Sequence, residues 1–321
     1  MAVFLVNLTA ASVLQIRKND TLPLDMAPDS IDDMYDGCRS ESAAMVDQLG
    51  VLEWHRNINF SLAWAGAQEK AKKPVHGHLG WDHATAIHIM TDTNLHTVRQ
   101  DFKTAVQTGK RKYKTSGFRY HYLYFQLTDA LRVLRQNQTL CRTTYLRKGK
   151  YFDLGVVDKT MRLGAFTLST SSKHLVGLLG GVSCFEICTC FGAEITYYSA
   201  TDQDRQVLIP PYEVFRVTDV LLETQGCKVL YKLQSTETPR SDLNCKLTTS
   251  RLKAYFIAVS GQEKGTGFVI VSMCLLILLA LSSLILTKRR QKRFVAVVLG
   301  TLLVFMVIVV SRRTWRWLNQ G

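Results

Sequence analysis

Hydrophobic residues follow two different periods along this chain, and the change falls near residue 140. Between residues 40 and 136 they recur at intervals of three and four positions, which predicts amphipathic helices. The clearest such positions are Leu95, Val98, Phe102, Ala105 and Val106, then Leu123, Leu127, Leu131 and Leu134. From Cys141 onward, short runs rich in β-branched and aromatic residues stand between Gly, Pro, Asp and Ser, which predicts strands.

Helices that precede strands, instead of alternating with them, predict an α+β fold, with a helical N-terminal half packed on a β-rich core. A doubly wound dinucleotide-binding fold is not expected, because no strand leads into a Gly-x-Gly-x-x-Gly turn and a helix. No internal repeat or low-complexity tract divides the chain. We expect a single domain over residues 20–260 and a short stalk over residues 261–266.

The C-terminal part contains an uncharged run over residues 267–287, GFVIVSMCLLILLALSSLILT. As a helix it is long enough to cross a hydrocarbon core of about 30 Å, so we predict a transmembrane segment. The basic cluster KRRQKR follows directly and is typical of the cytoplasmic side, which puts the preceding domain outside the cytosol. A second apolar run, residues 294–310, is shorter and is expected either to cross back or to re-enter the membrane.

A lipid-anchor signal beginning at Ser260 and Gly261 is the alternative interpretation of this tail. Such signals end in apolar sequence, whereas charged residues follow here, so a transmembrane span is favoured. At the other end, residues 1–14 (MAVFLVNLTAASVL) resemble a secretory signal peptide. Acceptor sequons at Asn7, Asn19, Asn59 and Asn137 fit a glycoprotein of the secretory pathway, displayed at the cell surface.

The net charge of +14 results from 40 Lys and Arg against 26 Asp and Glu, and alone it favours a nucleic-acid or anionic-membrane partner. Nine of the basic residues and none of the acidic ones lie from residue 264 onward, which leaves +5 on residues 1–263. The excess therefore flanks the apolar runs and indicates contact with membrane lipid. We expect no nucleic-acid partner, and we interpret KRKYK (residues 110–114) as a solvated loop between helices.

Eight cysteines are present, and Cys274 lies within the predicted span. The seven that remain cannot all pair with one another. The spacing of Cys184, Cys188 and Cys190 is not a standard zinc-binding pattern, and no histidine lies near them, so no metal site is predicted. Disulfides together with buried thiols are expected.

Four blocks carry a more specific signal: residues 25–38 (DMAPDSIDDMYDGC), 120–135 (YHYLYFQLTDALRVLR), 162–171 (RLGAFTLSTS) and 207–215 (VLIPPYEVF). In this order they resemble the vertebrate ecto mono-ADP-ribosyltransferases, which are arginine-specific glycosyltransferases. The resemblance covers about residues 25–250. It implies a β-rich core that binds NAD+ or NADP+, transfer of ADP-ribose to arginine side chains of protein acceptors, release of nicotinamide, and no metal.

Loss of nicotinamide passes through an oxocarbenium-like transition state, which needs a nearby carboxylate and ordered contacts to the diphosphate. The resemblance implies that Arg147, in the block CRTTYLRKG, pairs with the diphosphate. Leu146 holds the position directly after the aromatic residue, where many members place this arginine, so a slip of one residue is assumed. The Ser-Thr-Ser strand corresponds to Ser169, Thr170 and Ser171, with the Ser169 hydroxyl supporting the cofactor.

The Glu-x-Glu pair of active members is replaced here by Asp204-Arg205-Gln206. Gln206 can hydrogen-bond a ribose hydroxyl but carries no charge, and a single preorganised electrostatic contact is worth about 3 to 4 kcal/mol. Asp204 keeps a charge on a shorter arm, and Asp202 or Asp204 can fill the role only if the loop is re-registered. NAD+ binding is therefore better supported than turnover. The alternatives are a catalytically silent cell-surface binding glycoprotein and an NAD+ glycohydrolase.

The resemblance also implies disulfides that join Cys38 with Cys245 and Cys141 with Cys190. The first closes a loop of roughly 200 residues, which corresponds to about 5 kcal/mol in the chain-entropy treatment. Cys184, Cys188 and Cys227 are then left over. We expect them to be buried thiols, with a bond from Cys227 to a partner chain as the alternative.

Overall fold

The computed structural model describes residues 21–115, 117–136, 141–173, 181–201, 205–224 and 226–247. The chain divides into two compact units, Met1–Ala254 and Tyr255–Gly321, and every described residue belongs to the first. Within the described part, no helix has the length and apolar character needed to cross a membrane. The predicted signal segment 1–14, the stalk 261–266 and the apolar runs 267–287 and 294–310 lie outside it.

The N-terminal half is helical, as the period of three and four residues predicts. Its elements are α2 (Arg39–Arg56), α3 (Ile58–Lys70), α4 (Trp81–Thr91), the 3-10 turn η2 (Thr93–Leu95), α5 (His96–Thr108) and α6 (His121–Arg135). On α5, Val98, Phe102 and Val106 are buried at helical spacing. Helix α6 is buried along most of its length, because it packs against α2, α4 and β7 (Ala193–Glu194).

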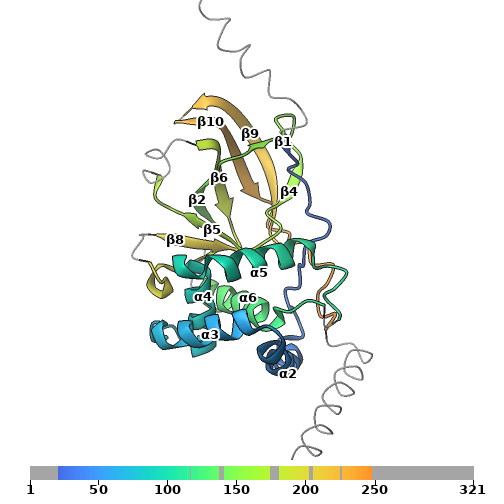
Figure 1. The fold of residues 1–321 in the computed structure, drawn as a ribbon. Helices are drawn as coiled ribbons and strands as arrows, with labels where there is room; N and C mark the ends of the chain where they lie inside the picture. Colours follow the sequence, from blue (N-terminus) through green and yellow to red (C-terminus); the bar gives the residue numbers. More distant parts are fainter. Residues whose placement is uncertain are drawn as a thin grey trace, which may run out of the picture. The chain divides into compact units, whose positions relative to one another are not determined.

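The second half is β-rich, so the predicted α+β class is confirmed. The strands are β1 (Thr21–Leu22), β2 (Arg142–Lys148), β3 (Tyr151–Phe152), β4 (Thr160–Arg162), β5 (Thr167–Thr170), β6 (Gly181–Thr189), β7, β8 (Gln206–Ile209), β9 (Val214–Thr224) and β10 (Cys227–Ser235), with the 3-10 turn η3 (Thr196–Tyr198) between β7 and β8. The larger sheet has the order β4-β9-β10-β6-β2-β5-β8-β7, and β1 pairs with β3. Figure 1 shows the helices beside the end of the sheet that carries β5 and β8.

Each half has its own apolar cluster. In the helical half, the rings of Trp54, Phe60, Trp64 and Tyr122 meet edge to face, with centroids 5.0 to 5.8 Å apart. In the sheet, Phe185 stacks on Tyr231 at 5.0 Å, within a core that includes Ile187, Val207, Phe215 and Val217. The first cluster packs α2, α3 and α6 together, and the second forms the core of the sheet.

A buried ion pair connects three distant segments. The Arg162 guanidinium donates to the Asp32 carboxylate at 3.0 Å and to the carbonyls of Met26 and Ala27 at 2.7 Å. Both charged side chains are fully shielded from solvent. The other Asp32 oxygen accepts from the backbone N–H of Leu243 at 2.9 Å. The N-terminal segment, strand β4 and the C-terminal end of the domain are thereby held together.

Both disulfides that the family resemblance implied are present, so that prediction is confirmed. Cys38 is bonded to Cys245 across 207 residues of chain, and Cys141 is bonded to Cys190 across 49. The first bond closes the domain next to the Asp32 contacts. The second ties the beginning of β2 to the end of β6.

The prediction that Cys184 and Cys227 are buried thiols is wrong, because the structure joins them in a third disulfide. Strands β6 and β10 are parallel neighbours, and Cys184 lies opposite Leu230, three residues after Cys227. The fold therefore brings together two cysteines that are far apart in sequence. Cys188, which is half-buried, is the free cysteine among the described residues.

Replacing Arg162 by Met is expected to reduce the free energy of unfolding by about 3 to 5 kcal/mol, because the Asp32 carboxylate would stay buried without its counter-ion. Thermal and urea unfolding of the full chain in neutral detergent, followed by near-UV circular dichroism, measures this loss. The matched control is Arg240→Met, which removes a surface pair with Asp242 and should cost under about 1 kcal/mol. Equal effects of the two substitutions would contradict the role given to the buried pair.

The pKa of the buried Asp33 carboxyl predicts that the stability of the domain depends on pH. Burial raises the pKa of its carboxyl to about 6, although Tyr113 and two backbone N–H groups donate to it. The folded state then holds a proton, between about pH 4 and 6, that the unfolded chain has released, so this contribution to stability falls as the pH rises through that window.

The difference in unfolding free energy between the wild type and Asp33→Asn should therefore decrease by at most about 3 kcal/mol from pH 4 to pH 7. Urea unfolding at each pH measures it. Asp36→Asn, which changes an exposed carboxylate nearby, is the control and should keep the wild-type profile. A pH-independent difference for Asp33→Asn would refute the raised pKa.

Candidate functional site

Three adjacent strands bring the residues of the predicted nucleotide site to one region of the sheet. Tyr145 of β2 lies opposite Thr170 of β5, and Thr170 lies opposite Gln206 of β8. Side chains that are opposite one another in register share a face of the sheet. Arg147, two residues after Tyr145, points to this face as well. The register therefore groups Arg147, Thr170 and Gln206.

Gln206 begins β8 and is only 2% exposed. Its side-chain amide donates to the Thr201 hydroxyl at 2.8 Å, and its backbone N–H donates to the Thr196 hydroxyl at 2.9 Å. Arg205, just before it, has a φ of 59°, in the left-handed region that non-glycine residues rarely adopt. The turn therefore holds Gln206 in one orientation. Asp204, together with Asp202, lies outside the described residues.

The Ser-Thr-Ser stretch supports this turn. The backbone N–H and the hydroxyl of Ser171 donate to the Arg205 carbonyl at 2.9 and 3.3 Å. The Thr170 hydroxyl accepts from the Ser172 backbone N–H at 3.1 Å. Ser169 lies on the opposite face, where its buried hydroxyl donates to the Val207 carbonyl at 3.1 Å. The structure thus places Thr170 with Gln206 and places Ser169 against the core.

The arginine of the family motif is assumed to lie one residue later in this chain, at Arg147 instead of position 146. This shift has a structural consequence. Leu146 packs against the core cluster that contains Phe185, its partner in register. Because side chains alternate along a strand, an arginine one residue later projects from the other face of β2. The Arg147 guanidinium therefore enters a different environment from the Leu146 side chain.

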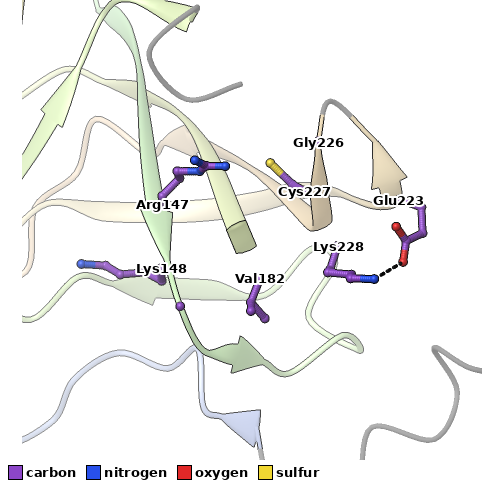
Figure 2. A pocket seen from close by; sticks show the side chains of 8 residues that line it. Arg147, Lys148, Val182, Glu223, Gly226, Cys227 and Lys228 are labelled. Atoms are coloured by element: carbon purple, nitrogen blue, oxygen red, sulfur yellow. Dashed lines mark ion pairs between the residues drawn. The ribbon is translucent and has the colours of Figure 1, made fainter. Parts of the chain in front are cut away.

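Arg147 projects into a pocket of about 600 Å³ at one end of the sheet, whereas Lys148 extends to the other side of its strand (Figure 2). All three guanidinium nitrogens of Arg147 are buried, and no acceptor among the described residues lies within hydrogen-bonding distance. Such a group is strongly destabilised unless an anion pairs with it. The pocket is therefore suited to an anionic ligand.

The surroundings of this pocket are basic. Lys228 stands at its rim, 3.5 Å from the Glu223 carboxylate. Lys148 also lines the pocket but extends to the other side of the strand (Figure 2), where burial and repulsion from Lys103 lower the pKa of its ammonium group to about 8. The disulfide from Cys184 to Cys227 forms part of the wall, because Cys184 lies opposite Arg147 in register. A rigid wall and an excess of positive charge fit a phosphate group.

The described residues that line this pocket come from β2, β6, β9, β10 and the adjoining turns, and none comes from β5 or β8. Arg147 and Gln206 thus share a face without lining one cavity. Sequence reasoning singled out Arg147 but missed Lys228 and Glu223. Their charge was the available signal, and it identifies a site only when the pairing of β6 with β10 is known.

One cluster has the ligand types of a metal site. Cys141, Cys190 and Glu237 lie close together, but the two sulfur atoms are bonded to each other. They therefore stabilise the fold, and Glu237 stands beside a disulfide. Because both sulfur atoms are in the disulfide, this cluster has no thiolate to bind a metal ion.

Known proteins resemble this chain over most of its length. The sequence model of the family described as NAD:arginine ADP-ribosyltransferase matches residues 24–240. Ecto-ADP-ribosyltransferase 5 of Homo sapiens is 32% identical over 77% of this chain and 87% of that protein. GPI-linked NAD(P)(+)--arginine ADP-ribosyltransferase 1 of Mus musculus is 31% identical over 73% of this chain and 76% of that protein.

Solved structures show that the likeness includes the fold. A mutant of the eukaryotic mono-ADP-ribosyltransferase ART2.2 in complex with NADH has a TM-score of 0.57 and 26% identity, covering 70% of this chain and 98% of that chain. A second ART2.2 mutant, in complex with NAD, has a TM-score of 0.56 and 25% identity, with the same coverage. The helical part and the β core of this chain correspond to that fold.

The fold and its disulfides are those of a nucleotide-dependent transferase domain of the ecto-enzyme type. The chain belongs to the NAD:arginine ADP-ribosyltransferase family, because the family model and relatives above 30% identity cover most of it. Three disulfides are typical of an oxidising compartment. The domain therefore faces the extracellular side, at the cell surface.

Replacing Arg147 by Met is expected to keep or raise the stability of the ligand-free protein, by up to about 2 kcal/mol, because an unpaired buried charge is removed. The same substitution should weaken NAD+ binding at least tenfold. Thermal unfolding without nucleotide and titration calorimetry with NAD+ measure the two effects.

The control for this experiment is Arg142→Met on the same strand, which removes an ion pair with Glu194 at the surface. It should leave NAD+ affinity unchanged. Two results would contradict the assignment: undiminished NAD+ binding by Arg147→Met, or a marked loss of stability in the ligand-free protein.

Proposed function

We propose that this chain is a cell-surface mono-ADP-ribosyltransferase that transfers ADP-ribose from NAD+ to arginine side chains of proteins and releases nicotinamide. Family membership supports the reaction class. The observation that carries the assignment to this chain is the buried Arg147 guanidinium, which has no partner among the described residues and faces a basic pocket. The diphosphate of NAD+, or of NADP+, supplies the anion that this group needs.

In this proposal the nucleotide lies along the face that Arg147, Thr170 and Gln206 share. Arg147 binds the diphosphate, and the Thr170 hydroxyl faces the ribose. Ser169 and Ser171 act through the backbone, because they hold the Val207 and Arg205 carbonyls on either side of Gln206. The ribose of the scissile bond is then placed beside the Gln206 amide.

Gln206 stabilises the reacting ribose less well than a glutamate would. Its amide oxygen can accept a hydrogen bond from a ribose hydroxyl but cannot balance the positive charge of the transition state. The side chain is nevertheless preorganised by Thr201. We propose that Asp204 helps to activate the acceptor arginine and that transfer is slow but real.

A second candidate is a silent member of the family that binds NAD+ at the cell surface without turning it over. Gln206 in place of a carboxylate is the observation that favours it. Water as the acceptor, which would make the chain an NAD+ glycohydrolase, is a third outcome. Product analysis distinguishes the three.

We also propose that residues 267–287 and 294–310 hold the protein in the membrane. The mouse relative is GPI-linked by name, whereas KRRQKR after residue 287 favours a spanning helix here. Resistance of the surface protein to a phosphatidylinositol-specific phospholipase would support the span. Release by that lipase would show a lipid anchor instead.

The decisive experiment compares the full chain with its Gln206→Glu variant, in neutral detergent, with labelled NAD+ and a small guanidino acceptor. Restoring the carboxylate is expected to raise the transfer rate by about 10² to 10³-fold, because the charge acts only in the transition state. The control is Gln107→Glu, which adds the same charge on the exposed face of α5 and should change nothing.

Labelled acceptor from the unmutated chain would exclude the silent candidate, and labelled free ADP-ribose would indicate hydrolysis. Saturable NAD+ binding without any product would refute the transferase proposal for this chain. If neither form binds NAD+, the assignment of the nucleotide site is wrong.

A further inference from the structure

The positive charge of the extracellular domain is concentrated in one place. Residues 100–120 contain six basic residues and one acidic residue, a net charge of +5. Residues 1–263 as a whole also carry +5. The C-terminal part of α5 and the loop that follows it thus account for the whole excess. A patch of this kind attracts polyanions.

A buried tyrosine determines how this loop presents its charges. Tyr113 is fully buried; its hydroxyl donates to Asp33 at 2.7 Å, and its carbonyl lies 2.8 Å from the His121 ring nitrogen. Backbone hydrogen bonds from Lys110 to Asp29 and from Lys112 to Gly109 shape the turn further. The sequence KRKYK is therefore a turn pinned by its aromatic residue, and its cations point outward.

Four of these cations are exposed: Arg111, Lys112, Lys114 and Arg119. No ion pair to any of them is found within the described part of the chain. Lys110, in contrast, is paired with Asp242 at 2.5 Å, and Asp242 also accepts from Arg240. We call Arg111, Lys112, Lys114 and Arg119 the basic loop surface.

A polar pocket of about 190 Å³ lies at the base of this surface. Lys112 and Arg119 line it together with the hydroxyl-bearing Thr104 and Thr108. Asp101, also in its lining, lies 3.3 Å from the Tyr120 hydroxyl and is the acidic residue there. The Thr104 and Thr108 hydroxyls donate to carbonyls within α5, so Lys112 and Arg119 are the side chains that can donate to a ligand there. Two cations at a small polar hollow suit a sulfate or phosphate group.

The aromatic residues of this region argue against nucleic acid as the partner. Tyr113, Phe118 and Tyr120 are all buried, with at most 4% of their surface exposed. Single-stranded nucleic acids bind by stacking bases on accessible rings, which this surface lacks. The domain also faces the extracellular side, whereas the anionic leaflet of the membrane is cytoplasmic.

We propose that the basic loop surface binds a sulfated polysaccharide. Such a chain carries closely spaced sulfates on sugars that have no π faces, which matches exposed cations without exposed rings. Several cations contact successive sulfates, and one sulfate enters the pocket between Lys112 and Arg119. The interaction holds the domain against the polysaccharide coat of a cell, and it is separate from the nucleotide site.

The test measures binding of the full chain, in neutral detergent, to immobilised heparin as a function of NaCl concentration. The variant Arg111→Ser/Lys112→Ser/Lys114→Ser should lose roughly 30- to 100-fold in affinity near 0.15 M salt and show a shallower salt dependence. The matched control, Lys70→Ser/Lys73→Ser/Lys159→Ser, removes the same charge from exposed positions elsewhere and should bind as the wild type does.

The charge-conserving variant Arg111→Lys/Lys112→Arg/Lys114→Arg should retain binding, and desulfated heparin should not bind. Equal losses in the test and control variants would overturn the proposal, because binding would then depend on overall charge or on the basic C-terminal tail. An oligonucleotide of similar charge that binds equally tightly, with the same response to the variants, would overturn the choice of partner. Unchanged thermal unfolding of the test variant shows that any loss is not due to misfolding.

Discussion

The buried pair of Asp32 and Arg162 is the contact on which the rest of the domain depends. A guanidinium with no solvent access is tolerated because one carboxylate and two carbonyls receive its hydrogen bonds. The same carboxylate accepts from the backbone of Leu243, next to the disulfide of Cys245. The loop of residues 110–114 is held by the hydrogen bond from the Tyr113 hydroxyl to Asp33, the neighbour of Asp32. The basic loop surface therefore depends on the same part of the chain.

Arg147 is also a buried arginine, but its surroundings differ from those of Arg162. Arg162 has every partner it needs within the protein, whereas the Arg147 guanidinium is buried with no acceptor among the described residues. Desolvation without pairing weakens a fold, so a group in this state indicates a ligand. The contrast between the two arginines is the physical basis of the proposal that the anionic part of the nucleotide binds at Arg147. Their surroundings, and not their residue type, separate a structural role from a binding role.

At Gln206 the structure holds an uncharged side chain in a fixed orientation. The left-handed Arg205, the Ser171 contacts and the Thr201 hydrogen bond all serve to orient one side chain. An amide in that position supports binding of a ribose hydroxyl more than formation of a cation. In the proposed function, this position therefore orients the ribose but stabilises the positive charge less than a glutamate would.

The order of helices and strands and the α+β class could be predicted from the sequence, because they follow from the hydrophobic period. Two of the disulfides were predicted as well, but only because four sequence blocks resemble a known family. The third disulfide could not, since Cys184 and Cys227 meet only through the parallel pairing of β6 with β10. Likewise, Arg147 was identified by its motif, but alternation along β2 decided that it faces away from Leu146 and towards Lys228. The basic residues of KRKYK are evident in the sequence, but only the burial of Tyr113 in the structure shows that they point to solvent. Local pattern determines which residues are present, and long-range packing determines which of them meet.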